Sequence, residues 1–298
     1  MEAYFVYVFL LYARKDHKAE ACVASLVLTV KVNCGVIGHL AALSELQEKI
    51  TGGYANGDFI TLLTDVTLDA TIVINKVDVA LTLDLGGKTI TANAGAFKLI
   101  AGEMTVKNGT INAADDAFVM GVKGTADSSN VVLNLEADLT VTSLDDCCVL
   151  VYDGELNTAA TLISKNEGVT DPANRYCAIQ GSGNNDNTVI NVLGGSITTV
   201  NDIAIYQPQN GKLNISGGTI TGTTAVYVKA GKLSITGGEF SGGLCNFSSG
   251  VIDGAKLLPG ADFSAYGSGS AAFVHSVNGV ETVLPYGENL LSHLGSGT

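Results

Sequence analysis

Acidic residues recur in the short polar turns of this sequence, at positions where carboxylates could act on carbohydrate. With one basic residue, these positions are Asp115-Asp116, Asp145-Asp146, Arg175 and Asn201-Asp202. A polysaccharide lyase uses carboxylates that hold Ca²⁺ against an anionic sugar and a base that removes a proton, whereas a glycosidase uses two carboxyl groups ~5 to 9 Å apart. The catalytic candidates are therefore Asp116, Asp146 and Arg175, and Ca²⁺ is expected as a cofactor only if the protein is a lyase.

The same acids have a simpler interpretation, in which they are polar turn residues that hydrogen-bond their own backbone. Gly-His-Gly and Arg-x-Lys elements, which one class of glycosidases carries, are absent, and the nearest match, Gly38-His39-Leu40, precedes all of the acidic turns. The net charge of −13 also repels a polyanionic substrate unless calcium intervenes. We therefore favour turn residues over a catalytic or metal site, and we expect no cofactor.

Two tyrosines are the candidate binding residues. Tyr206 and Tyr227 occupy equivalent positions of neighbouring repeats, so their rings are expected to lie one above the other. An exposed aromatic ladder suits the stacking of sugar rings, but the same residues also suit packing inside the protein or against a partner chain. The sequence leaves both alternatives open.

A pattern of apolar residues repeats along most of the chain. GKLNISGGTI from Gly211 returns as GKLSITGGEF from Gly231, with apolar residues at positions 0, +2 and +7. Five segments fit this pattern: Leu83, Leu85 and Ile90; Met104, Val106 and Ile111; Ile190, Val192 and Ile197; Leu213, Ile215 and Ile220; Leu233, Ile235 and Phe240. A degraded sixth has Leu156 and Ile163 in place, with Thr158 at an apolar position. Such a repeat predicts a solenoid of short strands that turn at glycine or asparagine.

A second pattern, a small residue followed by an apolar run, comes after each match. Its leading residues are Ala96, Ala117, Cys148, Cys177, Ala204, Ala225 and Cys245. Since stacked strands place equivalent residues about 4.8 Å apart, these residues are expected to form one interior column of small side chains. The three cysteines are then buried small hydrophobic residues rather than ligands or nucleophiles.

The predicted fold class is therefore all-β, a parallel β-helix with a cap at each end. Ser44 and Gln47 predict a short amphipathic capping helix that ends at Gly52, and Asn278-Gly279 predicts a closing hairpin. We divide the chain into an N-terminal attachment segment with the capping helix (1–57), the β-helix (58–255) and a C-terminal cap (256–298).

The segments SELQEKITGGYANGDFITLLTDVTLDATIVI, LDLGGKTIT and ISGGTITG resemble the right-handed, pectate-lyase-like β-helix regions of bacterial surface proteins and phage virion proteins. The resemblance covers residues 40–255. It implies a right-handed β-helix, and it leaves function open because such helices serve as enzymes, adhesins and inert spacers.

Composition limits the partners. Arginine occurs only at Arg14 and Arg175, which is too little clustered basic charge for a nucleic-acid surface. The apolar start has Glu2 before it and its basic residues after it, so it predicts neither a signal peptide nor a membrane span.

We expect a non-catalytic structural or binding protein on a virion (decoration, fibre or spike) or on a bacterial surface, as an adhesin. Its expected partners are other virion or surface proteins, glycans and further copies of itself. The alternative is a depolymerase, either a polysaccharide lyase or a glycoside hydrolase, on the same scaffold.

Overall fold

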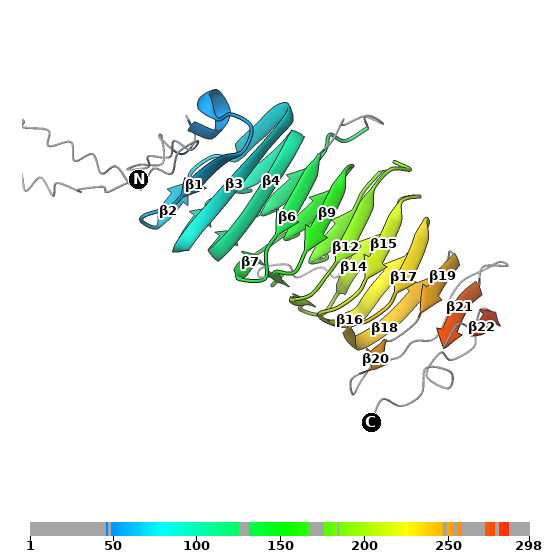
Figure 1. The fold of residues 1–298 in the computed structure, drawn as a ribbon. Helices are drawn as coiled ribbons and strands as arrows, with labels where there is room; N and C mark the ends of the chain where they lie inside the picture. Colours follow the sequence, from blue (N-terminus) through cyan, green and yellow to red (C-terminus); the bar gives the residue numbers. More distant parts are fainter. Residues whose placement is uncertain are drawn as a thin grey trace, which may run out of the picture.

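The computed structural model describes residues 46, 49–124, 131–166, 176–183, 185–246, 249–252, 255–257, 272–277 and 280–285 (Figure 1). The described part is an all-β structure with a large parallel sheet. Its strands pair in three stacks, which we call the first, second and third stack. Apart from the final strand, each strand hydrogen-bonds in parallel to its equivalent in a neighbouring repeat, an arrangement compatible with the β-helix that the sequence predicts.

Two long strands show how the chain passes between the stacks. These are β3 (Ile72–Ala92) and β4 (Phe97–Ala113), which pair with each other at three separate places. Each strand begins in the third stack, turns a corner into the first and turns again into the second. Later repeats divide the same path among separate short strands.

The first stack continues from β1 (Asp58–Thr61) through β3 and β4 to β6 (Val132–Leu135), β9 (Glu155–Thr158), β12 (Val189–Val192), β15 (Lys212–Ile215), β17 (Lys232–Ile235), β19 (Ser249–Ile252) and β21 (Ala272–Val277). The final strand, β22 (Val280–Pro285), pairs antiparallel with β21. This pairing confirms the C-terminal hairpin, whose turn residues Asn278 and Gly279 lie outside the described residues.

The other two stacks follow the same rule. The second contains β2 (Val66–Leu68), β3, β4, β7 (Leu139–Ser143), β10 (Thr161–Ser164), β13 (Ser196–Thr199), β16 (Thr219–Val228), β18 (Glu239–Asn246) and β20 (Lys256–Leu257). The third contains β3, β4, β5 (Phe118–Met120), β8 (Val149–Val151), β11 (Ile179–Gly181), β14 (Ile203–Gln207), β16 and β18.

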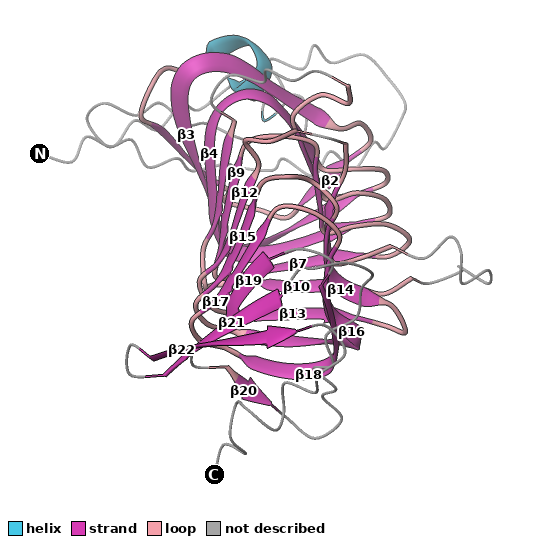
Figure 2. Cartoon of the chain, turned by 90° about the vertical axis from the view of Figure 1, so that its right-hand side faces the viewer, coloured by secondary structure: helices cyan, strands magenta, loops and turns pink. Residues whose placement is uncertain are grey.

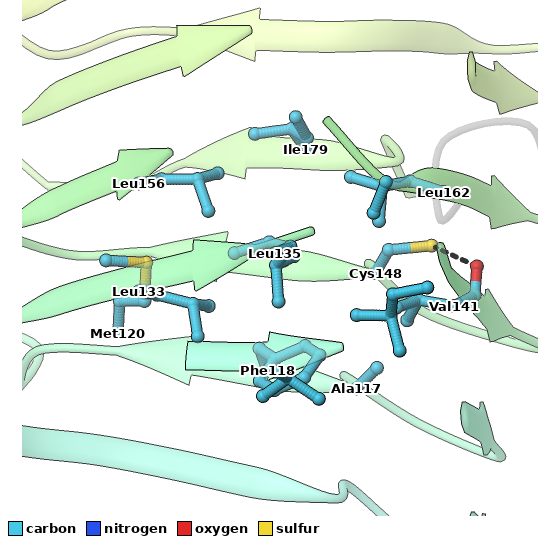
Figure 3. Close-up of a cluster of buried hydrophobic side chains, with 14 of the residues drawn as sticks. Ala117, Phe118, Met120, Leu133, Leu135, Val141, Cys148, Leu156, Leu162 and Ile179 are labelled. Atoms are coloured by element: carbon cyan, nitrogen blue, oxygen red, sulfur yellow. Dashed lines mark hydrogen bonds between the residues drawn. The ribbon is translucent and has the colours of Figure 1, made fainter. Parts of the chain in front are cut away.

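The apolar residues of the repeats meet between the stacks in one continuous core (Figure 3). Every residue of the five fitted segments is buried, to 2% exposure or less. The register within the first of these segments differs from the prediction, because Leu81 and Leu83 pair with Met104 and Val106, while Leu85 lies in the corner that follows. One repeat, Leu133, Leu135 and Val141, was missed because its corner is one residue longer.

The degraded repeat has a shorter corner, which makes the prediction for Ile163 wrong. Leu162 aligns with Ile197 and is fully buried, whereas Ile163 points outward and is partly exposed. Thr158 is buried at the apolar position, and its Oγ1 accepts a hydrogen bond of 3.3 Å from the backbone N–H of Ala160. The chain thus satisfies a buried hydroxyl within its own corner.

The interior column of small residues is confirmed for Cys148 and corrected for the other two cysteines. Ala178, not Cys177, precedes Ile179 and aligns with Cys148, so Cys177 is buried one position earlier. Cys245 pairs with Tyr227 on the outer side of the third stack and is only partly buried. Cys148 donates a weak hydrogen bond of 3.6 Å from Sγ to the carbonyl of Val141 (Figure 3).

At the N-terminal end, Lys49–Gly53 forms a short π-helix, η1, and Leu46 is helical. Leu46 and Ile50 are buried in the common core. Ser44 and Gln47, on which the prediction of a capping helix rests, lie outside the described residues.

Glycine is required at the corners between the first and second stacks. Gly195 and Gly218 have φ angles of 75° and 89°, a region that side chains other than glycine rarely adopt. A Cβ on Gly195 would also collide with the backbone carbonyls of Ala159 and Ala160 in the preceding repeat. The glycines therefore permit both the turn and the close stacking of successive corners.

We predict that Ile215→Asp lowers the free energy of unfolding by at least about 3 kcal/mol, because it places an unpaired carboxylate in the core. Thr236→Asp adds the same charge at an exposed position and should change stability little. Urea unfolding followed by circular dichroism measures both variants. Equal stability of the Ile215→Asp protein and the unmodified chain would contradict the register.

Candidate functional site

Asp116 and Asp146 meet in the turns between the second and third stacks. Asp116 follows β4, and Asp146 follows β7 one repeat later. The backbone N–H of Cys147 donates to Asp146 Oδ1 at 2.9 Å and to Asp116 Oδ1 at 3.2 Å. The N–H of Asp146 is in turn bound by Ser143 Oγ at 3.1 Å. The structure therefore brings together two of the three predicted catalytic residues, while Arg175 lies outside the described residues.

The two carboxyl groups lie close enough to hydrogen-bond to each other, which requires that one of them carries a proton. The pKa of Asp116 is raised from 3.8 to about 8, mainly by burial and next by the neighbouring charge of Asp146. Burial also raises the pKa of Asp146, although its hydrogen bond with Asp116 opposes this effect. A mutually hydrogen-bonded pair leaves no room between its carboxyls for the water or sugar that a glycosidase places there. The geometry indicates a shared-proton pair that closes a turn.

The cluster contains atoms that could ligate a metal ion. One carboxylate oxygen each from Asp116 and Asp146 and the Sγ of Cys147 lie within 4.8 Å of one another. Burial and both carboxylates raise the pKa of the Cys147 thiol well above its usual range, which keeps it protonated. Since the thiolate is the form that binds metal, an ion could occupy this cluster only by displacing the thiol proton.

The third acidic turn uses its carboxylate locally. Asp202 Oδ1 accepts a hydrogen bond of 2.6 Å from the N–H of Ile203, the first residue of β14. Asn201 has a φ angle of 59°, which suits an asparagine in a tight turn. This turn fits the interpretation of the acids as residues that satisfy their own backbone.

Tyr206 and Tyr227 are stacked neighbours on the outer side of the third stack. They pair between β14 and β16, with ring centroids 5.4 Å apart and ring planes 19° from parallel. Burial, the largest effect, raises the pKa of both hydroxyls, so both stay neutral at physiological pH. Each ring covers one face of the other, which leaves less aromatic surface for a sugar than the ladder prediction assumed.

An open groove of about 570 Å³ lies on the outer side of the first stack, and the sequence analysis did not predict it. Its lining residues are Phe59, Thr82, Thr105, Lys107, Glu136, Ala137 and Asp138. Lys107 Nζ lies 4.9 Å from the centre of the Phe59 ring and 4.0 Å from Asp84 Oδ2. Asp138 Oδ1 accepts a 2.8 Å hydrogen bond from the N–H of Asn108. Lys107 and Asp138 are therefore each in contact with a neighbouring residue.

A ladder of asparagines extends from this groove along the first stack. Asn134 Nδ2 donates to Thr105 Oγ1 at 3.2 Å, and Asn157, Asn191 and Asn214 each donate to the previous asparagine at 3.0, 2.7 and 2.8 Å. The sequence shows these residues as LNL, LNT, INV and LNI, an asparagine between two core residues in four repeats. Such a recurring asparagine predicts a ladder, whereas the apolar positions of the repeats do not reveal it.

Comparisons with known proteins found no relative. No protein family model matches the chain, and neither a curated protein nor a solved structure matches it. Among the described residues, no helix is both long and apolar enough to cross a membrane.

We predict that stability falls as pH rises through the range from about 4 to about 8. The unfolded Asp116 loses its proton near 3.8, whereas the folded residue keeps it up to about 8. The folded state therefore binds more protons in this range, and its stability is greatest below it. For one proton, the slope reaches at most about 1.4 kcal/mol per pH unit.

Asp116→Asn should remove most of this slope, and Asp145→Asn, at the exposed neighbouring carboxylate, is the matched control. Urea unfolding at several pH values measures both. The shared-proton account is wrong if the slope survives in Asp116→Asn.

Proposed function

We propose that the chain is a right-handed parallel β-helix that acts as a rigid, non-catalytic glycan-binding rod on a virion or bacterial surface. Three stacks of parallel strands and one continuous core support the architecture. The right-handed sense follows from the strong general preference for right-handed crossovers between parallel strands. Residues 1–57 would attach the rod to other surface or virion proteins.

The groove on the first stack is the observation that carries the binding proposal. Phe59 offers an apolar ring surface, and the hydroxyls of Thr82 and Thr105 stand beside it. Aromatic rings that pack against the apolar face of a sugar, together with a few fixed polar groups, are the usual means of binding uncharged polar ligands. The asparagine ladder continues these polar groups along the rod, where an extended glycan would lie.

Charge indicates the class of glycan. Glu136 and Asp138 are exposed at the groove, while Lys107 is paired with Asp84. The groove is therefore acidic, in a chain whose net charge is −13. A neutral or amine-bearing glycan suits this surface, and a polyuronate is repelled by it.

The depolymerase alternative depends on Asp116 and Asp146. Their mutual hydrogen bond favours a structural role, and the groove lies on a different stack. In a depolymerase, Asp116→Asn would abolish the release of reducing ends from a polysaccharide.

We predict that Phe59→Ala weakens glycan binding at least about tenfold, equivalent to about 1.4 kcal/mol, because it removes the apolar surface of the groove. A glycan array first identifies ligands of the unmodified protein, and biolayer interferometry then measures Kd. Tyr206→Ala, an aromatic truncation on the third stack, is the matched control and should leave Kd unchanged.

Two results would overturn the proposal. One is an array on which the protein binds no neutral or amine-bearing glycan. The other is a loss of affinity in Tyr206→Ala with none in Phe59→Ala. Reducing-end release that depends on Asp116 would establish the depolymerase instead.

A further inference from the structure

The outer side of the second stack is an ordered array of hydroxyl groups. From β3 to β16, two outward-facing columns run along it through six successive repeats. The first column is Thr89, Thr110, Thr140, Thr161, Ser196 and Thr219, and the second is Thr91, Asn112, Thr142, Ile163, Thr198 and Thr221. Nine of these twelve residues are threonine. Apart from Thr142, which is 7% exposed, all are partly or fully exposed.

The register fixes the positions of these groups in two directions. Equivalent residues of adjacent strands are about 4.8 Å apart, and residues i and i+2 of one strand are about 6.6 Å apart. Figure 2 shows β7, β10 and β13 lying one above another in this stack. Threonine is β-branched and therefore stiff about χ1, so few rotamers are open to each side chain of the array.

This array carries no charge, although the chain as a whole is strongly acidic. None of the twelve residues is ionisable, and charge returns only at the ends of the first column, with Asp65 before Thr89 and Glu239 after Thr219. Charged side chains would hold their own hydration shells above the surface. Their exclusion over six repeats leaves a surface of ten hydroxyl groups, the Asn112 amide and the Ile163 side chain.

A ligand that uses the whole array must itself repeat in two dimensions. A flexible soluble molecule contacts only a few repeats, whereas a crystal lattice engages equivalent groups at every repeat, so that many weak contacts act together. Ice is such a lattice, and it exposes planes on which oxygen atoms repeat at spacings close to those of the array. Its water molecules both donate and accept hydrogen bonds, as the threonine hydroxyls do.

We propose that the outer side of the second stack binds the surface of ice. The threonine hydroxyls take the place of lattice water, and the methyl groups between them fill the gaps of the adjoining layer. This surface is separate from the groove on the first stack, so the proposal does not depend on glycan binding.

The test measures thermal hysteresis and inhibition of ice recrystallisation with the full-length protein. Thr140→Lys, in the middle of the array, should reduce both several-fold, because it inserts a charged and hydrated side chain. Thr140→Val keeps the shape but removes the hydroxyl, and it should give a smaller loss. Gln180→Lys adds the same charge to the outer side of the third stack, where it should have no effect.

Circular dichroism and urea unfolding establish that each variant retains the fold. Ice shaping by the unmodified protein that is lost in Thr140→Lys and kept in Gln180→Lys supports the proposal. An unmodified protein without ice activity overturns it, as does an equal loss in the two lysine variants.

Discussion

In-register parallel stacking is the constraint on which the rest of this structure depends. Each strand hydrogen-bonds to its equivalent in the next repeat, so every position becomes a column with a spacing of about 4.8 Å. Where equivalent positions carry similar side chains, the same kind of contact recurs in each successive repeat. Inward columns make a continuous apolar core, and the outward columns make the asparagine ladder, the stacked tyrosines and the threonine array. A single outward asparagine or threonine on one strand thus becomes part of a surface that extends over several repeats.

The same spacing forces like groups together, and the chain responds in different ways. Asparagines pair favourably because an amide both donates and accepts, as Asn157 does between Asn134 and Asn191. Ionised carboxylates have no hydrogen-bond donor, so Asp116 and Asp146 can hydrogen-bond to each other only when one of them is protonated. The raised pKa of Asp116 follows first from its burial in the turn and then from the neighbouring charge of Asp146, and neither cause requires a catalytic role.

The sequence predicted the strands and their inward residues because the apolar positions alternate with period two. Prediction from the sequence was least reliable at the corners, because their lengths differ from repeat to repeat while the strands remain in register. The distance from Leu156 to Leu162 is six residues and that from Leu81 to Ile90 is nine, which explains the errors at Ile163 and Leu85. Cys177 and Cys245 were misplaced for the same reason. The meeting of Asp116 and Asp146 could be predicted from their equivalent turns. The groove at Phe59 could not be predicted, because its lining residues come from four repeats. Their positions relative to one another depend on the lengths of the corners.

The register itself is tested most directly by disulfide trapping along the first stack. In a chain with Cys22, Cys34 and Cys245 replaced by serine, Lys212→Cys is combined with either Lys232→Cys or Ser234→Cys. Lys212 and Lys232 are paired neighbours, whereas Ser234 lies two residues further along the same strand. A disulfide requires Cα atoms within about 7 Å of each other. The account predicts rapid, nearly complete bridging of the first pair on mild oxidation and none of the second, measured by mass spectrometry. Bridging of the second pair in preference to the first would contradict it.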